Sequence, residues 1–326
     1  MSYVKTDSEQ LLLDDLQIEH SKYCFIREGI SENNYLSSLE RSLNTLGLLE
    51  PLVVHSDTRG EIHLVDGFKR AVLLKRNGAR HCRVKVLSSE TPLDYILNLL
   101  FLSQSHRISF SFVSRASFVN LCLDLGLENK QIINQFLPLL GFEGHETIMR
   151  NCAKVIKLPK LVLEFCDKKR LSMKQCVHLT HFSDELLTIV FSWKDILNLT
   201  VSLIEELLEG LETILRRESL DLYVLLKELG VDDLLMASIS PQVKTEKLRR
   251  KIKIKKYPVL SRVNEKIEKT KNEMNLPCHV LLYRDQSIEN HKLDFKIHIK
   301  KIEDLETALE KLQQTKTSVE KILEAL

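Results

Sequence analysis

The chain contains no run of about 18 apolar residues, so its sequence predicts no membrane-spanning helix. Its first residues, MSYVKTDSEQ, lack the apolar core of an export signal, and we therefore expect a cytoplasmic protein. The seven cysteines are odd in number and include no CxxC pair, which excludes a disulfide framework or a zinc ribbon. An excess of one charge is also missing: 47 Lys and Arg face 45 Asp and Glu, so any basic surface must be local.

The most informative segment lies between residues 47 and 71, where GLLEPLVV is followed by a polar gap and then by EIHLVDGFKRA. This pattern predicts a strand, a turn, a second strand and a helix that opens at Gly67, with Lys69 and Arg70 in its first turn. Unpaired N–H groups at a helix N-terminus carry partial positive charge, so two cations beside them predict a pocket for an anion such as phosphate. The alternative is a turn glycine followed by a solvated helix face.

Strand-like and helix-like pieces alternate from Lys22 to about Ser89, which predicts a small α/β domain. From Pro92 to Trp193 apolar residues recur at helical spacing, so we expect an all-helical middle. Two short helices within it, ENKQIINQFLPLLG and HETIMRNCAKVIKLP, are separated by a turn and predict a helix-turn-helix. Arg and Asn reach guanine and adenine edges, and the candidate DNA-contacting residues are His145, Thr147, Arg150, Asn151 and Lys154. The alternative is a helical hairpin that packs without touching DNA.

Residues 197–235 continue as amphipathic helix, which we interpret as packing surface. The segment KTEKLRRKIKIKK, residues 244–256, then holds eight Lys or Arg against the single acid Glu246. We interpret 241–257 as a basic linker in which Arg249, Arg250 and Lys251 contact the DNA backbone, since Lys and Arg bind phosphate without reading sequence. A plain solvated linker is the alternative.

After Pro258 the sequence predicts a helix, two strands and a closing helix. The closing helix carries a stripe at 3-4-3-4 spacing that is apolar except at one lysine, as in helix pairing. The members of the stripe are Ile302, Leu305, Leu309, Leu312, Lys316, Val319, Leu323 and Leu326. We interpret 258–326 as a dimer-forming unit, the alternative being a helix that packs on its own sheet.

The order of these parts resembles the ParB family of DNA-partition proteins, whose N-terminal domain shares a fold with sulfiredoxin. Gly47 and Pro51 look like the family's first phosphate motif, and Gly67, Lys69 and Arg70 look like the second. The end of the predicted recognition helix is similar through IMRNCAKVIKLP. The resemblance implies an α+β protein with a nucleotide-binding domain at 1–110, a helical DNA-binding domain at 111–240, the linker at 241–257 and a dimerisation domain at 258–326.

ParB-type proteins are CTP-dependent DNA clamps, so the resemblance implies CTP or another nucleoside triphosphate, double-stranded DNA, a homodimer, a partition ATPase as partner, and a nucleoid-associated location. It places the chain in partition of a chromosome or plasmid, or in maintenance of a mobile element. The family's third motif, Glu-Asn-x-x-Arg, corresponds here to Ser103, Gln104 and Arg107. Arg107 is retained as a phosphate ligand, but Mg²⁺ loses its carboxylate-bearing site, and Phe68 replaces an acidic residue of the second motif. The degenerate motif predicts at most weak CTPase activity.

A second hypothesis is a phosphotransferase or nuclease on the same N-terminal fold. Asp66 is then the nearest candidate base, and Lys69 and Arg70 hold phosphate. No metal-binding set is identified from the sequence, because Cys176 and His178 fall on different sides of the expected helix.

Overall fold

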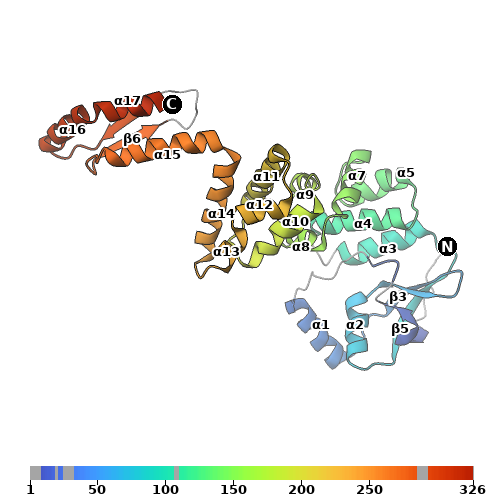
Figure 1. The fold of residues 1–326 in the computed structure, drawn as a ribbon. Helices are drawn as coiled ribbons and strands as arrows, with labels where there is room; N and C mark the ends of the chain where they lie inside the picture. The colour runs from blue at the N-terminus through green and yellow to red at the C-terminus, as the bar shows by residue number, and fades with distance from the viewer. Residues whose placement is uncertain (1–8, 19–20, 25–32, 106–109, 285–292, 326) are drawn as a thin grey trace. The chain divides into compact units, whose positions relative to one another are not determined.

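The computed structural model describes residues 9–18, 21–24, 33–105, 110–284 and 293–325 (Figure 1). The chain divides into two compact units, Met1–Ser192 and Trp193–Leu326. Its class is α+β, as the sequence predicts. Among the described residues, no helix combines the length and apolar character needed to cross a membrane.

A sheet in the first unit is built from β1 (Glu9–Leu12), β2 (Leu16–Gln17), β3 (Leu52–Ser56), β4 (Ile62–Asp66) and β5 (His81–Leu87). The order across the described sheet is β1-β5-β3-β4-β2. β3 and β4 form the antiparallel hairpin that the sequence predicts, and β3 also pairs with β5 in parallel. Because β3 and β4 are antiparallel, the loop before β3 lies beside the end of β4 and the start of α2.

The two faces of this sheet have different surroundings because side chains alternate along each strand. Leu52, Val54 and Leu64 are fully buried on one face, in a cluster that includes Ala71 of α2 (Phe68–Arg76). His55 and His63 are cross-strand partners. They lie at the alternate positions of the strands, so they face the other side of the sheet, where they are also buried. α2 thus covers one face, while α3 (Leu93–Ser105) packs against β4.

The rest of the first unit is helical, as expected. Its helices are α4 (Phe112–Asp124), α5 (Asn129–Gln131), a π-helical turn (Ile132–Phe136), α6 (Leu137–Leu139), α7 (Glu146–Val155), α8 (Lys160–Lys168), α9 (Met173–Leu179) and α10 (Asp184–Ser192). α4 packs side by side with α7 (Figure 1). The stretch 129–139, the turn after it and α7 confirm the predicted helix-turn-helix.

The second unit begins with a short 3-10 turn (Trp193–Asp195), α11 (Val201–Glu218), α12 (Leu222–Glu228), α13 (Val231–Met236) and α14 (Pro241–Lys256). The predicted linker at 241–257 is therefore wrong as a description of local structure: most of it is helix α14, packed along α11. Leu248 and Ile252 of α14 are buried, and a Cβ on Gly210 of α11 would lie 2.6 Å from the Ile252 side chain. Buried apolar residues at i and i+4 hold the helix in place despite its high charge.

The C-terminal segment has the predicted α-β-β-α order, in α15 (Pro258–Glu273), β6 (Val280–Arg284), β7 (Leu293–Ile297) and then two helices. The closing segment is divided into α16 (Ile302–Gln314) and α17 (Lys316–Ala325) at the buried Thr315. The prediction of a single closing helix with one continuous apolar stripe is therefore wrong. α17 packs on α15 in Figure 1, and Ile322 is buried in a cluster with Ile267 and Leu282. Ile322 lies outside the expected stripe; of the stripe, Val319 packs against this cluster, whereas Ile302, Leu309 and Leu323 are exposed.

The packing of α14 predicts how truncation of its buried side chains affects the second unit. Leu248→Ala should lower the free energy of opening of α11 and α14 by about 2–5 kcal/mol, because it removes a fully buried side chain and leaves a cavity. Ile254→Ala, at a residue of the same helix that is 47% exposed, should change it by less than about 0.5 kcal/mol. Amide hydrogen exchange of both helices measures this. Equal protection in the two variants would restore the linker interpretation.

Candidate functional site

Gly67 forms the junction between β4 and α2 and has a left-handed backbone with φ of +98°. A Cβ at this position would lie 2.6 Å from Cδ2 of Leu52, so only glycine fits both the backbone and the space. As the N-cap residue, Gly67 has no side chain with which to cap α2. The first-turn N–H groups of α2, from Phe68 onward, thus form the positive helix end that the sequence predicts.

Arg70 lies beneath this junction rather than on its surface, with only 8% of the residue exposed. Nη2 donates a hydrogen bond to Oδ2 of Asp66 at 3.0 Å, and Nη1 donates to the carbonyl oxygen of Glu50 at 2.6 Å. Nη1 also lies 3.4 Å from the carbonyl oxygen of Pro51. The guanidinium therefore ties the 47–51 loop to the start of α2, and the structure gives it a bracing position between the two predicted phosphate motifs.

The 47–51 loop is held from a second side by Arg83 of β5, which sequence reasoning missed. Its Nη2 donates to the carbonyl oxygen of Leu48 and lies 3.4 Å from that of Leu49. Gly47 ends α1 (Asn33–Leu46), and its N–H donates to the carbonyl oxygen of Leu43. Two arginines thus bind the carbonyl groups of four successive residues, 48–51, and fix the loop beside α2.

The third predicted motif reaches the same place through Ser103 at the end of α3. Its hydroxyl donates to Oδ1 of Asp66 at 3.2 Å and to the carbonyl oxygen of Leu100 at 3.0 Å. The structure thereby brings Gly67, Asp66 and Ser103 together. The predicted phosphate ligand Arg107 lies outside the described residues.

The remaining predicted cation, Lys69, is half-buried in the first turn of α2. Asp66, the candidate base of the enzymatic hypothesis, accepts hydrogen bonds on both carboxylate oxygens, from Arg70 and Ser103. A carboxylate held in this way organises its neighbours and directs neither oxygen at a substrate proton. The geometry therefore suits anion binding better than proton abstraction.

The predicted DNA-contacting residues lie along one face of α7. Thr147, Arg150, Asn151 and Lys154 follow i, i+3, i+4, i+7 spacing; all are exposed except Asn151, which is half-buried. The opposite face is buried, through Met149, Cys152 and Val155. Arg150 pairs with Glu146 at 2.7 Å.

The turn before α7 carries His145, whose exposed side chain lies 3.4 Å from Oε2 of Glu143. Arg115 of α4 supports this turn: its Nη1 donates to the carbonyl oxygen of Leu140 at 3.2 Å, and its guanidinium lies 4.5 Å from the centre of the Phe142 ring. The brace comes from outside the helix-turn-helix, so the motif alone could not reveal it.

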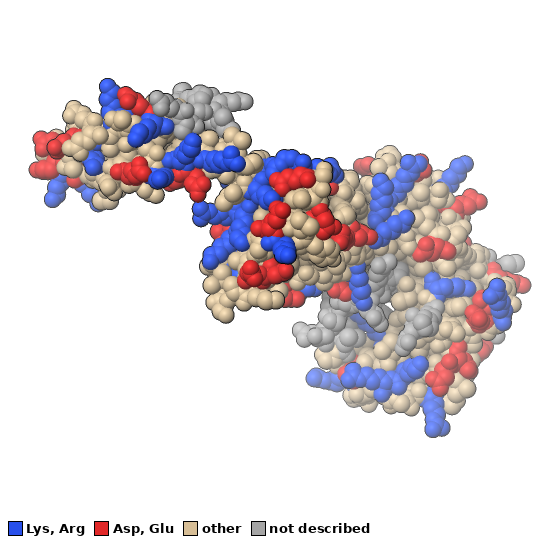
Figure 2. Space-filling model, viewed as in Figure 1, with Lys and Arg blue, Asp and Glu red and all other residues tan. Residues whose placement is uncertain are grey.

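Figure 2 shows Lys and Arg side chains gathered on the surface in the region of α14, but several of these cations are bonded to groups of the same unit. Arg249 pairs with Glu206 of α11 at 2.7 Å, and Lys251 donates to the carbonyl oxygen of Leu229 at 2.6 Å. All three predicted phosphate contacts in this helix are exposed, and Arg250 lies on the side directly opposite the buried Leu248 and Ile252.

No family model matches the chain, and no curated protein matches it. Solved structures with some likeness include the C-terminally truncated chromosome-partitioning protein ParB from Caulobacter crescentus. Its complex with CTP-gamma-S is 17% identical, with coverage of 55% of this chain and 94% of that chain and a TM-score of 0.27. Its complex with the centromeric parS site is 17% identical, with coverage of 62% and 99% and a TM-score of 0.31.

A Pnob8-like ParB-N domain is 16% identical, with coverage of 64% of this chain and 91% of that chain and a TM-score of 0.38. Likeness at this level does not establish membership of a family, and it assigns no ligand to this chain.

The bracing position of Arg70 predicts a large effect on stability. Arg70→Ala should lower the free energy of opening of β4 and α2 by about 2–4 kcal/mol, because it leaves the mostly buried Asp66 carboxylate without its counter-ion. Arg70→Lys should fall between this variant and the wild type, since an ammonium lacks the planar fork that reaches both Asp66 and Glu50. Arg76→Ala, at an exposed site in the last turn of α2, is the control. Hydrogen exchange that is equal in all three would contradict the brace.

Proposed function

We propose that this chain is a ParB-like DNA-binding protein, in which α7 contacts double-stranded DNA and the junction between β4 and α2 binds a nucleoside triphosphate. The observation that carries the proposal is the outward face of α7. A helix whose polar face presents Thr, Arg, Asn and Lys, and whose other face is anchored in the unit, has the form of a recognition helix.

Arg150 and Asn151 are the residues assigned to base edges, because Arg matches guanine and Asn matches adenine through paired hydrogen bonds. Thr147 and Lys154 flank them on the same face, and His145 lies at its N-terminal end; these three are assigned to flanking contacts, with Lys154 on phosphate. The pair between Arg150 and Glu146 lies on the surface, so exchange of Glu146 for a base costs little.

The nucleotide proposal rests on the positive end of α2 and on Lys69. The adjoining loop, with Gly47 and Pro51, is fixed by Arg70 and Arg83, so a phosphate meets an ordered surface rather than one that it must order. We assign the phosphate contact to Lys69 and the α2 backbone, and Arg70 to their positioning. The triphosphate is of the CTP type by the sequence resemblance, and Arg107 is its further proposed ligand.

The same resemblance supports a wider role in partition of a chromosome or plasmid, or in maintenance of a mobile element. A homodimer formed through residues 258–326, a partition ATPase as partner and association with the nucleoid belong to this proposal. Mg²⁺ would accompany the nucleotide. Ser103 offers a hydroxyl in place of the family's carboxylate and is already bonded to Asp66, so we expect weak hydrolysis at most.

DNA binding is tested at Arg150 and at a matched control. Arg216 of α11 is also exposed and also pairs with a glutamate four residues earlier, at the same distance of 2.7 Å. We expect Arg150→Ala to weaken binding to a duplex selected from a random-sequence library by about 1–3 kcal/mol, and Arg216→Ala to have no effect. Fluorescence anisotropy over a range of salt concentrations measures both. Equal losses in the two variants would mean that α7 does not contact DNA.

Nucleotide binding is tested by Lys69→Ala, with Lys75→Ala in the last turn of the same helix as control. Calorimetry with CTP, ATP, GTP and UTP should show at least a roughly tenfold loss for Lys69→Ala only, since a charge-assisted contact to phosphate is worth about 1.5–3 kcal/mol. Unchanged nucleotide affinity in Lys69→Ala would contradict the proposed phosphate pocket. Turnover that disappears in Asp66→Asn would favour the phosphotransferase or nuclease instead.

A further inference from the structure

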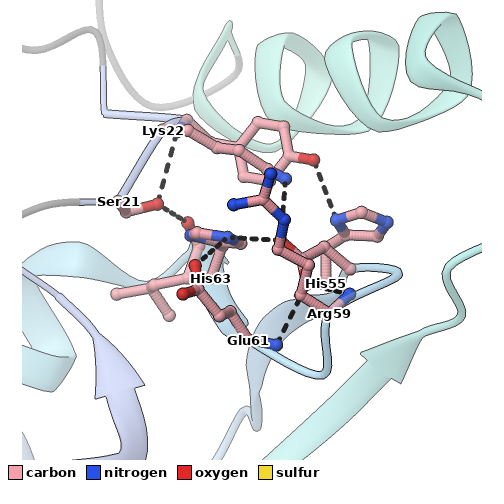
Figure 3. Close-up of polar contacts among 9 residues, drawn as sticks. Ser21, Lys22, His55, Arg59, Glu61 and His63 are labelled. Carbon is pink, nitrogen blue, oxygen red and sulfur yellow. Dashed lines mark hydrogen bonds and ion pairs between the residues drawn. The ribbon is translucent and has the colours of Figure 1, made fainter.

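The turn between β3 and β4 carries a group of potential metal ligands that the sequence did not reveal. Asp57 and Glu61 lie in this turn, and His63 follows in β4. One donor atom from each of the three lies within 4.8 Å of the others. The set lies on the sheet face opposite the α2 core, away from the phosphate motifs. In Figure 3 the His63 ring lies between Lys22 above it and Glu61 below it.

The distances within this group suit a small tetrahedral ion. Nε2 of His63 lies 3.2 Å from Oδ2 of Asp57 and 3.7 Å from Oε2 of Glu61. Bonds of about 2.0–2.1 Å at tetrahedral angles place ligand atoms about 3.3 Å apart. The Asp57 and Glu61 oxygens lie within 4.8 Å of each other, so an ion could enter between the three donors once the exposed Glu61 side chain turns toward it.

His63 is the fixed member of the group. It is only 7% exposed, and its Nε2 lies against the carboxylates of Asp57 and Glu61. His55, its cross-strand neighbour, is not available as a ligand through Nδ1, which shares a hydrogen bond with the Tyr23 hydroxyl at 2.9 Å.

Asp57 is preorganised as an anion. Its Oδ1 accepts hydrogen bonds from the N–H groups of Arg59 and Glu61, which leaves Oδ2 directed at His63. Lys22 already places a cation 3.8 Å from the same Oδ2. Because Lys22 is about one-third exposed, its ammonium can move into water when another cation binds.

We propose that Asp57, Glu61 and His63 form a binding site for a divalent metal ion, with Zn²⁺ as the preferred ion and water as its fourth ligand. One imidazole and two carboxylates are ligands that Zn²⁺ accepts readily, whereas Mg²⁺ and Ca²⁺ prefer oxygen alone. The ion would join the turn to β4 and so stabilise the hairpin that ends at Asp66. It would compete with Lys22 for the Asp57 carboxylate.

The surroundings of His63 also predict the strength of the site. Metal on Nε2 leaves the proton on Nδ1, which has no hydrogen-bond partner among the described residues. Ligand histidines normally donate this second N–H, and loss of the acceptor costs about 10- to 100-fold in affinity. We therefore expect binding weaker than that of a fully supported zinc site by about that factor.

The test is calorimetry with Zn²⁺ in a Cys24→Ser, Cys278→Ser background, because these two exposed thiols could bind the ion themselves. We expect one ion per chain, a roughly tenfold or larger loss of affinity in Glu61→Gln, and no change in Glu90→Gln, an exposed acid outside the group. Glu61 is exposed, so its substitution should leave the fold intact.

Lys22→Met separates a specific site from general attraction to surface acids. Removal of the competing ammonium should strengthen Zn²⁺ binding, and the β3–β4 amides should gain protection from hydrogen exchange when Zn²⁺ is added. Co²⁺ bound in place of Zn²⁺ should show the visible absorption of a tetrahedral site. Affinity that is equal in the parent and Glu61→Gln, or unchanged in Lys22→Met, would overturn the proposal.

Discussion

The buried guanidinium of Arg70 is the contact on which the candidate nucleotide site depends. It joins the carboxylate of Asp66 to the carbonyl group of Glu50, and so connects a strand end to a loop that precedes the neighbouring strand. A planar fork with several donors can serve both partners, whereas a lysine reaches one of them. The close approach also requires Gly67, since a Cβ there would press on Leu52. Backbone shape at the helix end therefore follows from one glycine and one arginine.

Cations serve the same purpose elsewhere in the chain, where they hold carbonyl groups that helix ends and loops leave unpaired. Arg83 binds the 47–51 loop, and Arg115 binds the turn before α7. In the second unit Lys251 binds the end of α12, and Arg217 donates to the last carbonyl groups of α14. The number of Lys and Arg residues in a segment therefore overestimates the positive charge that the segment can offer to a ligand. Part of the charge in residues 244–256 satisfies the backbone of neighbouring helices.

The local sequence pattern was sufficient to predict secondary structure where a single periodicity, that of a strand or of a helix, dominates a segment. The β3–β4 hairpin and the helix start at Gly67 follow from alternation and a glycine, and 3.6-residue spacing predicts helix α7 but not which of its polar residues face outward. The local sequence pattern gave wrong predictions where contacts with residues far away in the sequence determine the structure. The high charge of α14 led to the prediction of a linker, although Leu248 and Ile252 are buried. The regular apolar spacing after Ile302 predicted one helix, although the helix is interrupted at Thr315. The burial of Arg70 and the meeting of Asp57, Glu61 and His63 depend on strand register and turn geometry, which spacing alone does not determine.

The distribution of charge bears on how such a protein would hold DNA. Contacts to phosphate supply affinity, and contacts to base edges supply specificity. Lys251 is bonded to a backbone carbonyl group and Arg249 to the exposed Glu206, so part of the charge of α14 is already engaged, although all three of its assigned residues are exposed. In the proposed complex, α7 contributes affinity as well as recognition, with Lys154 assigned to phosphate beside Arg150 on a base. A single helix that does both binds weakly by itself, because it makes few phosphate contacts. A protein of this kind needs a second copy of the helix on the same duplex, which gives the proposed dimer through residues 258–326 a physical purpose.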